Sequence, residues 1–253
     1  MKNYNKYVAI HQPHYFPWLG YMDKMAKVGT FMLMDEVQLT DSSNMFRNKF
    51  LSKSGNDRFL TVCFNKAGYM EKPFSMVEIN HAIDWQKKHK NFILDTYRKA
   101  PYFEEIWSQI EHIFNEQYET VCQVSIDSIM IVKRLLGIPT ELTYQSNYPY
   151  DHSAKRNELV INLCQCMGAE RYLSGNGARK YMQLNAFERV GITVTYQQFS
   201  AFLYPQINSQ EFHPNLSSLD LLFNCGIKRS RELFWQNVKQ GKEVYECNKW
   251  SET

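Results

Sequence analysis

The chain has 253 residues and a net charge of +3, which is too small and too evenly spread to indicate nucleic-acid binding. Hydrophobic residues make up 44% of it, enough for a sizeable core, yet no stretch approaches the roughly 20 apolar residues of a membrane span. The length suits one α/β domain or two small ones. The apolar run before His11 is too short for a signal peptide, so we expect a cytoplasmic protein with reduced cysteines.

A strand, a tight loop and a helix are predicted near the start of the chain. Residues 8–10 form an apolar run long enough for a buried strand. Pro13 and Pro17 then exclude the interior of a regular strand or helix. From Gly20 onward, apolar residues recur at helical spacing.

Three polar side chains, His11, Gln12 and His14, fall in the predicted loop. They lie at the carboxyl end of a strand and beside a helix N-terminus, where open α/β sheets bind ligands. Either histidine could act as a general base, because an imidazole titrates near neutral pH. Gln12, with backbone N–H groups, could stabilise an oxyanion. The alternative is a proline-stiffened connection whose aromatic residues fill the core.

A second apolar strand ends in Asp35, and the order strand, helix, strand indicates a right-handed parallel unit. Asp35 and Gln38 should then emerge at the same edge of the sheet as His11. Asp35 could orient an imidazole or bind hydroxyl groups of a ligand, or it could be a turn residue. The polar loop over residues 41–48 could close over this edge, where Arg47 would grip a phosphate or carboxylate unless it is simply solvated.

The rest of the chain alternates between helical and extended patterns. A helical pattern spans residues 85–136, breaks near Pro101 and is expected to end at Gly137. We therefore predict an α/β fold: a mostly parallel sheet flanked by helices, with a helical insertion around residues 85–136. The other predicted elements are a hairpin or an added sheet edge over residues 49–64, strands over residues 140–146, 171–174 and 191–196, and helices over residues 159–167 and 181–187.

The last predicted helix carries two polar side chains on one face. Ser217 is suited to cap its N-terminus, and Asp220 and Asn224 follow four residues apart. Capping explains Ser217 but not an Asp and an Asn on a face that looks buried. We expect residues 1–226 to form a single α/β domain, and residues 227–253 to form a peripheral helix and tail.

A glycine turn at Ser174 and Gly175 is a second candidate anion site, because such a turn presents backbone N–H groups at a helix start. It matches neither a Walker loop nor Gly-x-Gly-x-x-Gly, so a plain turn is an equal alternative. The six cysteines contain no Cys-x-x-Cys pair, and no third ligand stands at a fixed spacing from His11 and His14. The sequence therefore predicts no metal site, and it assigns no cofactor and no oligomeric state.

Several short motifs, in order along the chain, resemble the WbqC-like family, which occurs in bacterial gene clusters for O-antigen and other surface polysaccharides. The resemblance covers residues 7–226. The matching motifs are His11-Gln-Pro-x-Tyr-x-Pro-Trp-x-Gly-Tyr21, Asp35-x-Val-Gln38, Arg47-Asn48, Leu60-Thr-Val62, Tyr172-Leu-Ser-Gly175, Tyr204-x-Gln206 and Leu216-Ser-x-Leu-Asp-x-Leu-Phe-Asn-x-Gly226.

This resemblance implies transfer of an amino acid or acyl group, glycine in particular, onto a polysaccharide sugar. The partners would be a nucleotide-linked amino sugar or uronic acid and a small acyl or aminoacyl donor. The catalytic candidates are His11, Gln12, His14 and Asp35. The substrate-binding candidates are Tyr15, Trp18, Gln38, Arg47, Asn48, Ser174, Gly175, Tyr204, Gln206, Ser217, Asp220 and Asn224.

Two further functions stay open at this point. His11-x-x-His14 loosely resembles the histidine motif of HUP-type nucleotidylyltransferases and ATP-dependent ligases, although Pro13 stands where those proteins carry glycine. Their histidines stabilise a pentavalent phosphate electrostatically. The abundance of Tyr, Trp, Asn and Gln would also suit a non-catalytic sugar-binding subunit of an assembly complex.

Overall fold

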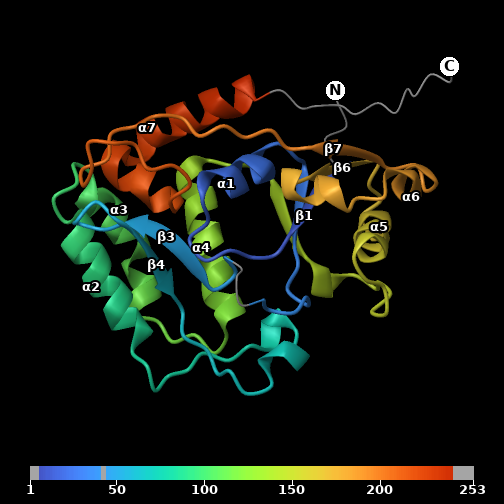
Figure 1. The fold of residues 1–253 in the computed structure, drawn as a ribbon, viewed down its shortest axis with the longest axis horizontal. Helices are drawn as coiled ribbons and strands as arrows, with labels where there is room; N and C mark the ends of the chain where they lie inside the picture. Colours follow the sequence, from blue (N-terminus) through green and yellow to red (C-terminus); the bar gives the residue numbers. More distant parts are fainter. Residues whose placement is uncertain (1–5, 41–43, 242–253) are drawn as a thin grey trace.

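The computed structural model describes residues 6–40 and 44–241, which form an α/β fold around a five-stranded parallel sheet (Figure 1). Neighbouring strands follow the order β5-β2-β1-β6-β7, and every pair is parallel. The predicted fold class is confirmed. The strands are β1 (Tyr7–His11), β2 (Thr30–Leu33), β5 (Glu141–Tyr144), β6 (Arg171–Ser174) and β7 (Thr193–Tyr196).

The strand order reverses at β1, because the chain builds outward through β2 to β5 and then returns to add β6 and β7 on the other side. In open α/β sheets, the crevice at such a reversal, outside the carboxyl ends of the strands, is the usual ligand site. Here that crevice lies between the ends of β1 and β6. It is therefore the first place to look for function.

Helices cover both faces of the sheet, and the side chains of β1 alternate between the two layers. Tyr7 and Ala9 join a core with residues of α1, α4 and α7, whereas Val8 and Ile10 join a core with residues of α5 and α6. Figure 1 shows these helices on opposite sides of the strands. The helices are α1 (Leu19–Ala26), α4 (Val121–Leu136), α5 (Asn157–Cys166), α6 (Leu184–Glu188) and α7 (Ser218–Gln240).

The predicted helical insertion lies between β2 and β5, together with a separate antiparallel hairpin of β3 and β4. Its last helix, α4, begins at a capping box formed by Thr120 and Gln123 and ends at Gly137, whose φ of 65° favours glycine. The α4 helix also packs on the main sheet and against α7. The remaining elements are β3 (Arg47–Leu51), β4 (Asp57–Thr61), α2 (Trp85–Tyr97) and α3 (Phe103–Ile110).

Two helices differ from expectation. The helix expected over residues 181–187 shortens to the five-residue α6, because a 3-10 turn over Asn176–Lys180 precedes it and Tyr181 is exposed. The α7 helix continues past Gly226, where the backbone kinks at a φ of 70°, and buries Phe234 farther along. The division at residue 226 stays a prediction, and the tail beyond residue 241 lies outside the described residues.

None of the helices in residues 6–40 and 44–241 is long and apolar enough to cross a membrane. The longest of them, α7, has Asp220 in its first turn and Lys239 in its last. Asp220 and Asn224 of this helix are buried, as is Phe234 farther along. This agrees with the absence of a long apolar run from the sequence.

Candidate functional site

The crevice between β1 and β6 opens where the two strands stop pairing. The pairing of β1 with β6 ends at Ala9, which lies opposite Leu173. The pairing of β1 with β2 continues two residues farther, to His11 opposite Leu33. We use the name crevice for the region beyond Ala9, at the strand-order reversal.

Lys24 of α1 contacts both strands at this point. Its Nζ donates a hydrogen bond to the carbonyl oxygen of Ile10 at 2.9 Å and lies 6.0 Å from the centroid of the Tyr172 ring. The side chain is buried, and burial lowers its pKa to about 7. Among the described residues, no carboxylate forms an ion pair with this ammonium. A buried cation without a counterion gives the crevice affinity for an anion.

The two histidines of the opening motif lie together at the same crevice. The ring centroids of His11 and His14 are 4.8 Å apart with perpendicular planes, and His14 stacks on Tyr21 at 4.7 Å. His14 is almost fully buried, and its Nδ1 has no hydrogen-bond partner within the described part of the chain. An orphaned buried nitrogen costs free energy unless a ligand satisfies it.

The tautomer of His11 follows from its hydrogen bond. Its Nδ1 lies 3.1 Å from the carbonyl oxygen of Gln12, which can only accept, so Nδ1 carries the proton. The Tyr21 hydroxyl donates to the same carbonyl at 3.2 Å and holds it in place. Nε2 of His11 is thereby left as an unprotonated acceptor. The backbone of Gln12, rather than its side chain, orients the imidazole.

Both imidazoles are uncharged at neutral pH. Burial lowers the pKa of His14 to about 3, with a smaller contribution from the nearby Lys24. Burial also lowers the pKa of His11 well below its usual range, and Lys24 and then His14 add to this effect. An anion bound beside Lys24 would offset its charge and raise the pKa of both histidines. The site is therefore set to take up a proton when an anionic ligand enters.

The buried histidines predict loss of stability in acid. His14 and the buried His89 each have a pKa lowered to about 3, whereas an unfolded histidine titrates near 6.5. Between these values the unfolded chain binds more protons, so the free energy of unfolding falls as pH drops from 6.5 towards 3. We expect a loss of about 1 kcal/mol per pH unit per histidine.

Urea unfolding at pH 7.5, 5.5 and 4.5 measures this loss. His14→Phe keeps an aromatic ring stacked on Tyr21, and no hydrogen bond of Nδ1 is lost. The number of protons bound on unfolding in acid should therefore fall by about one, which lowers the slope of the unfolding free energy against pH. The exposed His81→Phe is the matched control. An unchanged slope in His14→Phe would contradict a buried, uncharged His14.

Asp35 ends up at the same sheet edge but is already engaged. Its two carboxylate oxygens accept from the backbone N–H and the hydroxyl of Ser146, at 3.0 and 2.6 Å. It thus ties the end of β2 to the turn after β5. It also lines a cavity of about 530 Å³ with Cys122 and Tyr144. Gln38 is exposed and pairs with Pro73, outside the crevice.

Three other predicted binding residues hold the proline loop in place. The Tyr15 hydroxyl hydrogen-bonds Nδ1 of His89 at 3.0 Å, and Nδ2 of Asn48 donates to the carbonyl of Phe16 at 2.7 Å. Tyr15 and Asn48 are buried within the core. Trp18 packs edge-on against a phenylalanine of the segment after β7. Their engagement inside the protein fits the structural alternative for this loop better than direct ligand contact.

Ser174 ends β6 beside the crevice, and Gly175 follows it. The Ser174 side chain is buried, and Tyr172, two residues earlier on β6, has its ring centroid 6.0 Å from Nζ of Lys24. Gly175 has an extended backbone with open space where a Cβ would stand, so the turn does not require glycine for its conformation. A 3-10 turn over Asn176–Lys180 follows directly.

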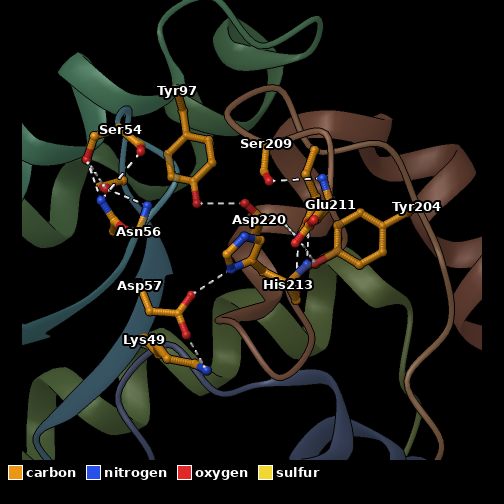
Figure 2. A network of polar contacts seen from close by, with 12 residues as sticks. Lys49, Ser54, Asn56, Asp57, Tyr97, Tyr204, Ser209, Glu211, His213 and Asp220 are labelled. Carbon is orange, nitrogen blue, oxygen red and sulfur yellow. Dashed lines mark hydrogen bonds and ion pairs between the residues drawn. The ribbon is translucent and has the colours of Figure 1, made fainter.

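The other predicted residues, apart from Arg47, form a separate polar cluster around Asp220 (Figure 2). The Tyr97 hydroxyl donates to Oδ1 of Asp220 and Nε2 of Gln206 donates to Oδ2, each at 2.8 Å. The hydroxyl of Tyr204 is a further partner of this carboxylate. Gln206 also exchanges hydrogen bonds with the backbone of His213. Burial raises the pKa of Asp220, and these partners counteract the shift.

Asn224 and Ser217 complete the attachment of this segment to α7. Asn224 lies one turn after Asp220, as predicted, and its amide donates to the Asp220 backbone while its oxygen accepts from Ile207. Ser217 caps α7 by accepting from Leu219, as predicted. Because these polar atoms are satisfied within the protein, the cluster fastens the segment around residues 204–217 to the core.

Sequence reasoning missed Lys24 and Tyr21 as site residues. They are three residues apart on α1 and therefore lie on the same face of the helix. From this face they contact the backbone of Gln12 and Ile10. The sequence signal that could have identified Lys24 is its position three residues after Tyr21, the last residue of the opening motif. No group of three or more His, Cys, Asp or Glu side chains in the described ranges is arranged to hold a metal ion.

An open parallel sheet with helices on both faces and a polar crevice at its strand-order reversal defines a doubly wound α/β protein. The chain belongs to the WbqC-like protein family, which it matches over residues 12–232. It is similar to "Uncharacterized protein Rv1507c" of Mycobacterium tuberculosis (strain ATCC 25618 / H37Rv), with 31% identity over 223 residues, covering 87% of this chain and 94% of that protein. No solved structure matches the chain at a significant level.

Proposed function

We propose that this protein is an acyl or aminoacyl transferase of surface-polysaccharide biosynthesis that acts on a nucleotide-linked sugar. The observation that carries the proposal is the crevice between β1 and β6, where the buried Lys24 has no counterion and lies beside two uncharged imidazoles. A nucleotide diphosphate supplies the missing negative charge. The cytoplasmic location expected from the sequence remains part of this proposal.

His11 has the role of general base in this reaction. Its unprotonated Nε2 accepts the proton of the attacking amine of the sugar as the new N–C bond forms, and the donor's leaving group departs with the bonding electrons. The nearby diphosphate raises the pKa of His11 and so favours this transfer. His14, through its unpartnered Nδ1, and the amide of Gln12 are the candidates to stabilise the oxyanion.

The strand order favours a second candidate, an ATP-dependent amide ligase or nucleotidylyltransferase of the HUP type. A histidine at the end of the first strand of a sheet with this order stands where a nucleotide's phosphates bind. This argument rests on analogy of fold, and Pro13 still occupies the place of the expected glycine. In this reaction Lys24 and His14 would stabilise a pentavalent phosphate instead of orienting a diphosphate.

A thermal-shift screen separates the candidates. We expect stabilisation by UDP-linked sugars if the transferase proposal holds, and by ATP with magnesium if the ligase holds; at 100 times the dissociation constant the gain is about 2.7 kcal/mol. Stabilisation by neither would contradict both and favour a binding subunit. The screen therefore also identifies the substrate for an activity assay.

His11→Gln should lower turnover about 10²- to 10⁴-fold while leaving the dissociation constant of the nucleotide within a few-fold, because the base acts in the chemical step. His81→Gln, an exposed histidine far along the chain, serves as the matched control. Equal losses of affinity and turnover in His11→Gln would assign His11 to binding. Unchanged turnover would exclude it as the base.

A further inference from the structure

A second cavity, of about 990 Å³, lies between the β3–β4 hairpin and the segment that follows it, apart from the crevice. Its size falls at the upper end of the roughly 300–1,000 Å³ typical of small-molecule sites. The apolar wall includes Phe46, Phe64, Tyr69, Val77 and Ile83. Two of the aromatic contacts in this wall, Phe46 with Phe64 and Phe64 with Tyr69, have ring centroids 5.1 Å apart.

Arg47, the first residue of β3, supplies the cation of this cavity. The central carbon of its guanidinium lies 4.8 Å from the Phe59 ring centroid and 5.6 Å from that of Phe46. Its Nε is buried, and this atom has no hydrogen-bond partner among residues 6–40 and 44–241. Aromatic rings thus hold the guanidinium in place while at least one donor stays unsatisfied.

The other charges of the cavity leave it positive. Glu78 pairs with Lys72 at 3.3 Å and accepts from Asn65, so its charge is already compensated. Lys66 is exposed at the rim. A planar guanidinium with a free donor is the protein group best matched to a carboxylate, phosphate or sulfonate.

We propose that this cavity binds an organic anion with an apolar or aromatic body, whose acidic group is anchored on Arg47. The proposal is independent of the reaction at the β1–β6 crevice. It also gives Arg47 a place different from the sheet edge that it was expected to cover, because β3 carries its side chain to the hairpin cavity.

Two fluorescent probes of similar shape test the proposal: anilinonaphthalene sulfonate, which is anionic, and phenylnaphthylamine, which is neutral. We expect Arg47→Gln to weaken binding of the sulfonate about tenfold and to leave the neutral probe unchanged. Arg58→Gln, on the neighbouring strand and exposed, is the matched control and should change neither. Ile83→Trp, which fills the rim of the cavity, should weaken both probes.

Three results would overturn the proposal: unchanged sulfonate binding in Arg47→Gln, equal weakening of both probes in that variant, or no effect of Ile83→Trp. A thermal melt of each variant confirms that it is folded. UDP-linked sugars are titrated in parallel, and Arg47→Gln should bind them as the parent protein does. A failure of the cavity proposal is thereby distinguishable from a failure of the proposed function.

Discussion

Replacing Lys24 with methionine should abolish nucleotide binding and at the same time stabilise the folded protein. The ammonium is the uncompensated charge of the β1–β6 crevice, so its loss should weaken binding of a UDP-linked sugar at least 100-fold. Methionine has a similar length and no charge to bury. If the variant is more stable but cannot bind the nucleotide, then Lys24 serves binding at a cost in stability.

The stabilisation has a defined pH dependence. Burial lowers the pKa of Lys24 from its ordinary 10.5 to about 7, so the unfolded chain binds more protons between these values and the parent protein gains stability as pH rises through them. The full shift corresponds to roughly 5 kcal/mol, and we expect Lys24→Met to recover only about 2 kcal/mol of it at pH 7, because the Ile10 carbonyl loses its donor. The gain should vanish at about pH 9, where the remaining penalty for burying the charge equals the cost of the unsatisfied Ile10 carbonyl, and Lys24→Met should be less stable than the parent protein at pH 10.

Urea unfolding at pH 7 and pH 10 and a calorimetric titration with a UDP-linked sugar measure the two effects. Lys87→Met, at an exposed position of α2, is the matched control and should alter neither. Binding of Lys24→Met within twofold of the parent protein would remove Lys24 from the site. Destabilisation at pH 7 would show that its charge is compensated.

Asp220→Ala should lower the free energy of unfolding by about 3–5 kcal/mol without direct loss of nucleotide binding. The substitution strands the buried donors of Tyr97 and Gln206 and releases the segment that Gln206 fastens to α7. Asp220→Asn keeps the shape and one acceptor, so it should cost about 1–2 kcal/mol. The separation of this cluster from the crevice is the reason that affinity should survive.

Urea unfolding at pH 7 and nucleotide titration at low temperature check this prediction. Glu232→Ala removes an exposed carboxylate of α7 and should change stability by less than about 0.5 kcal/mol. If Asp220→Ala were as stable as the parent protein, the structural role of Asp220 would be contradicted. If it also lost nucleotide binding, Asp220 would be assigned to substrate binding.

The parallel sheet was predictable because β1 and β2 contain short apolar runs and because later extended segments alternate with helical patterns. The same local signals located His11 and His14 at a strand end and paired Asp220 with Asn224 on one face of a helix. These features depend on residues close together in sequence. The hairpin and the helical insertion followed from the same kind of pattern.

Other features depend on contacts between distant segments and could not be predicted. Lys24 looks like a solvent-facing helix residue, and only the early end of pairing between β1 and β6 turns its position into a crevice. Tyr15 and Asn48 have the chemistry of ligand contacts, yet the proline loop needs them to satisfy its own polar groups. The partner of Asp220 on α2, Tyr97, is 123 residues away along the chain.

The most direct test of the account is to follow the histidine ring signals by NMR while a UDP-linked sugar is added to the protein and to Lys24→Met. The crevice account predicts that the signals of His11 and His14 shift, that the pKa of both rises, and that the variant shows neither change. Shifts confined to exposed histidines such as His81, or the same shifts in Lys24→Met, would contradict the assignment of the β1–β6 crevice as the nucleotide site.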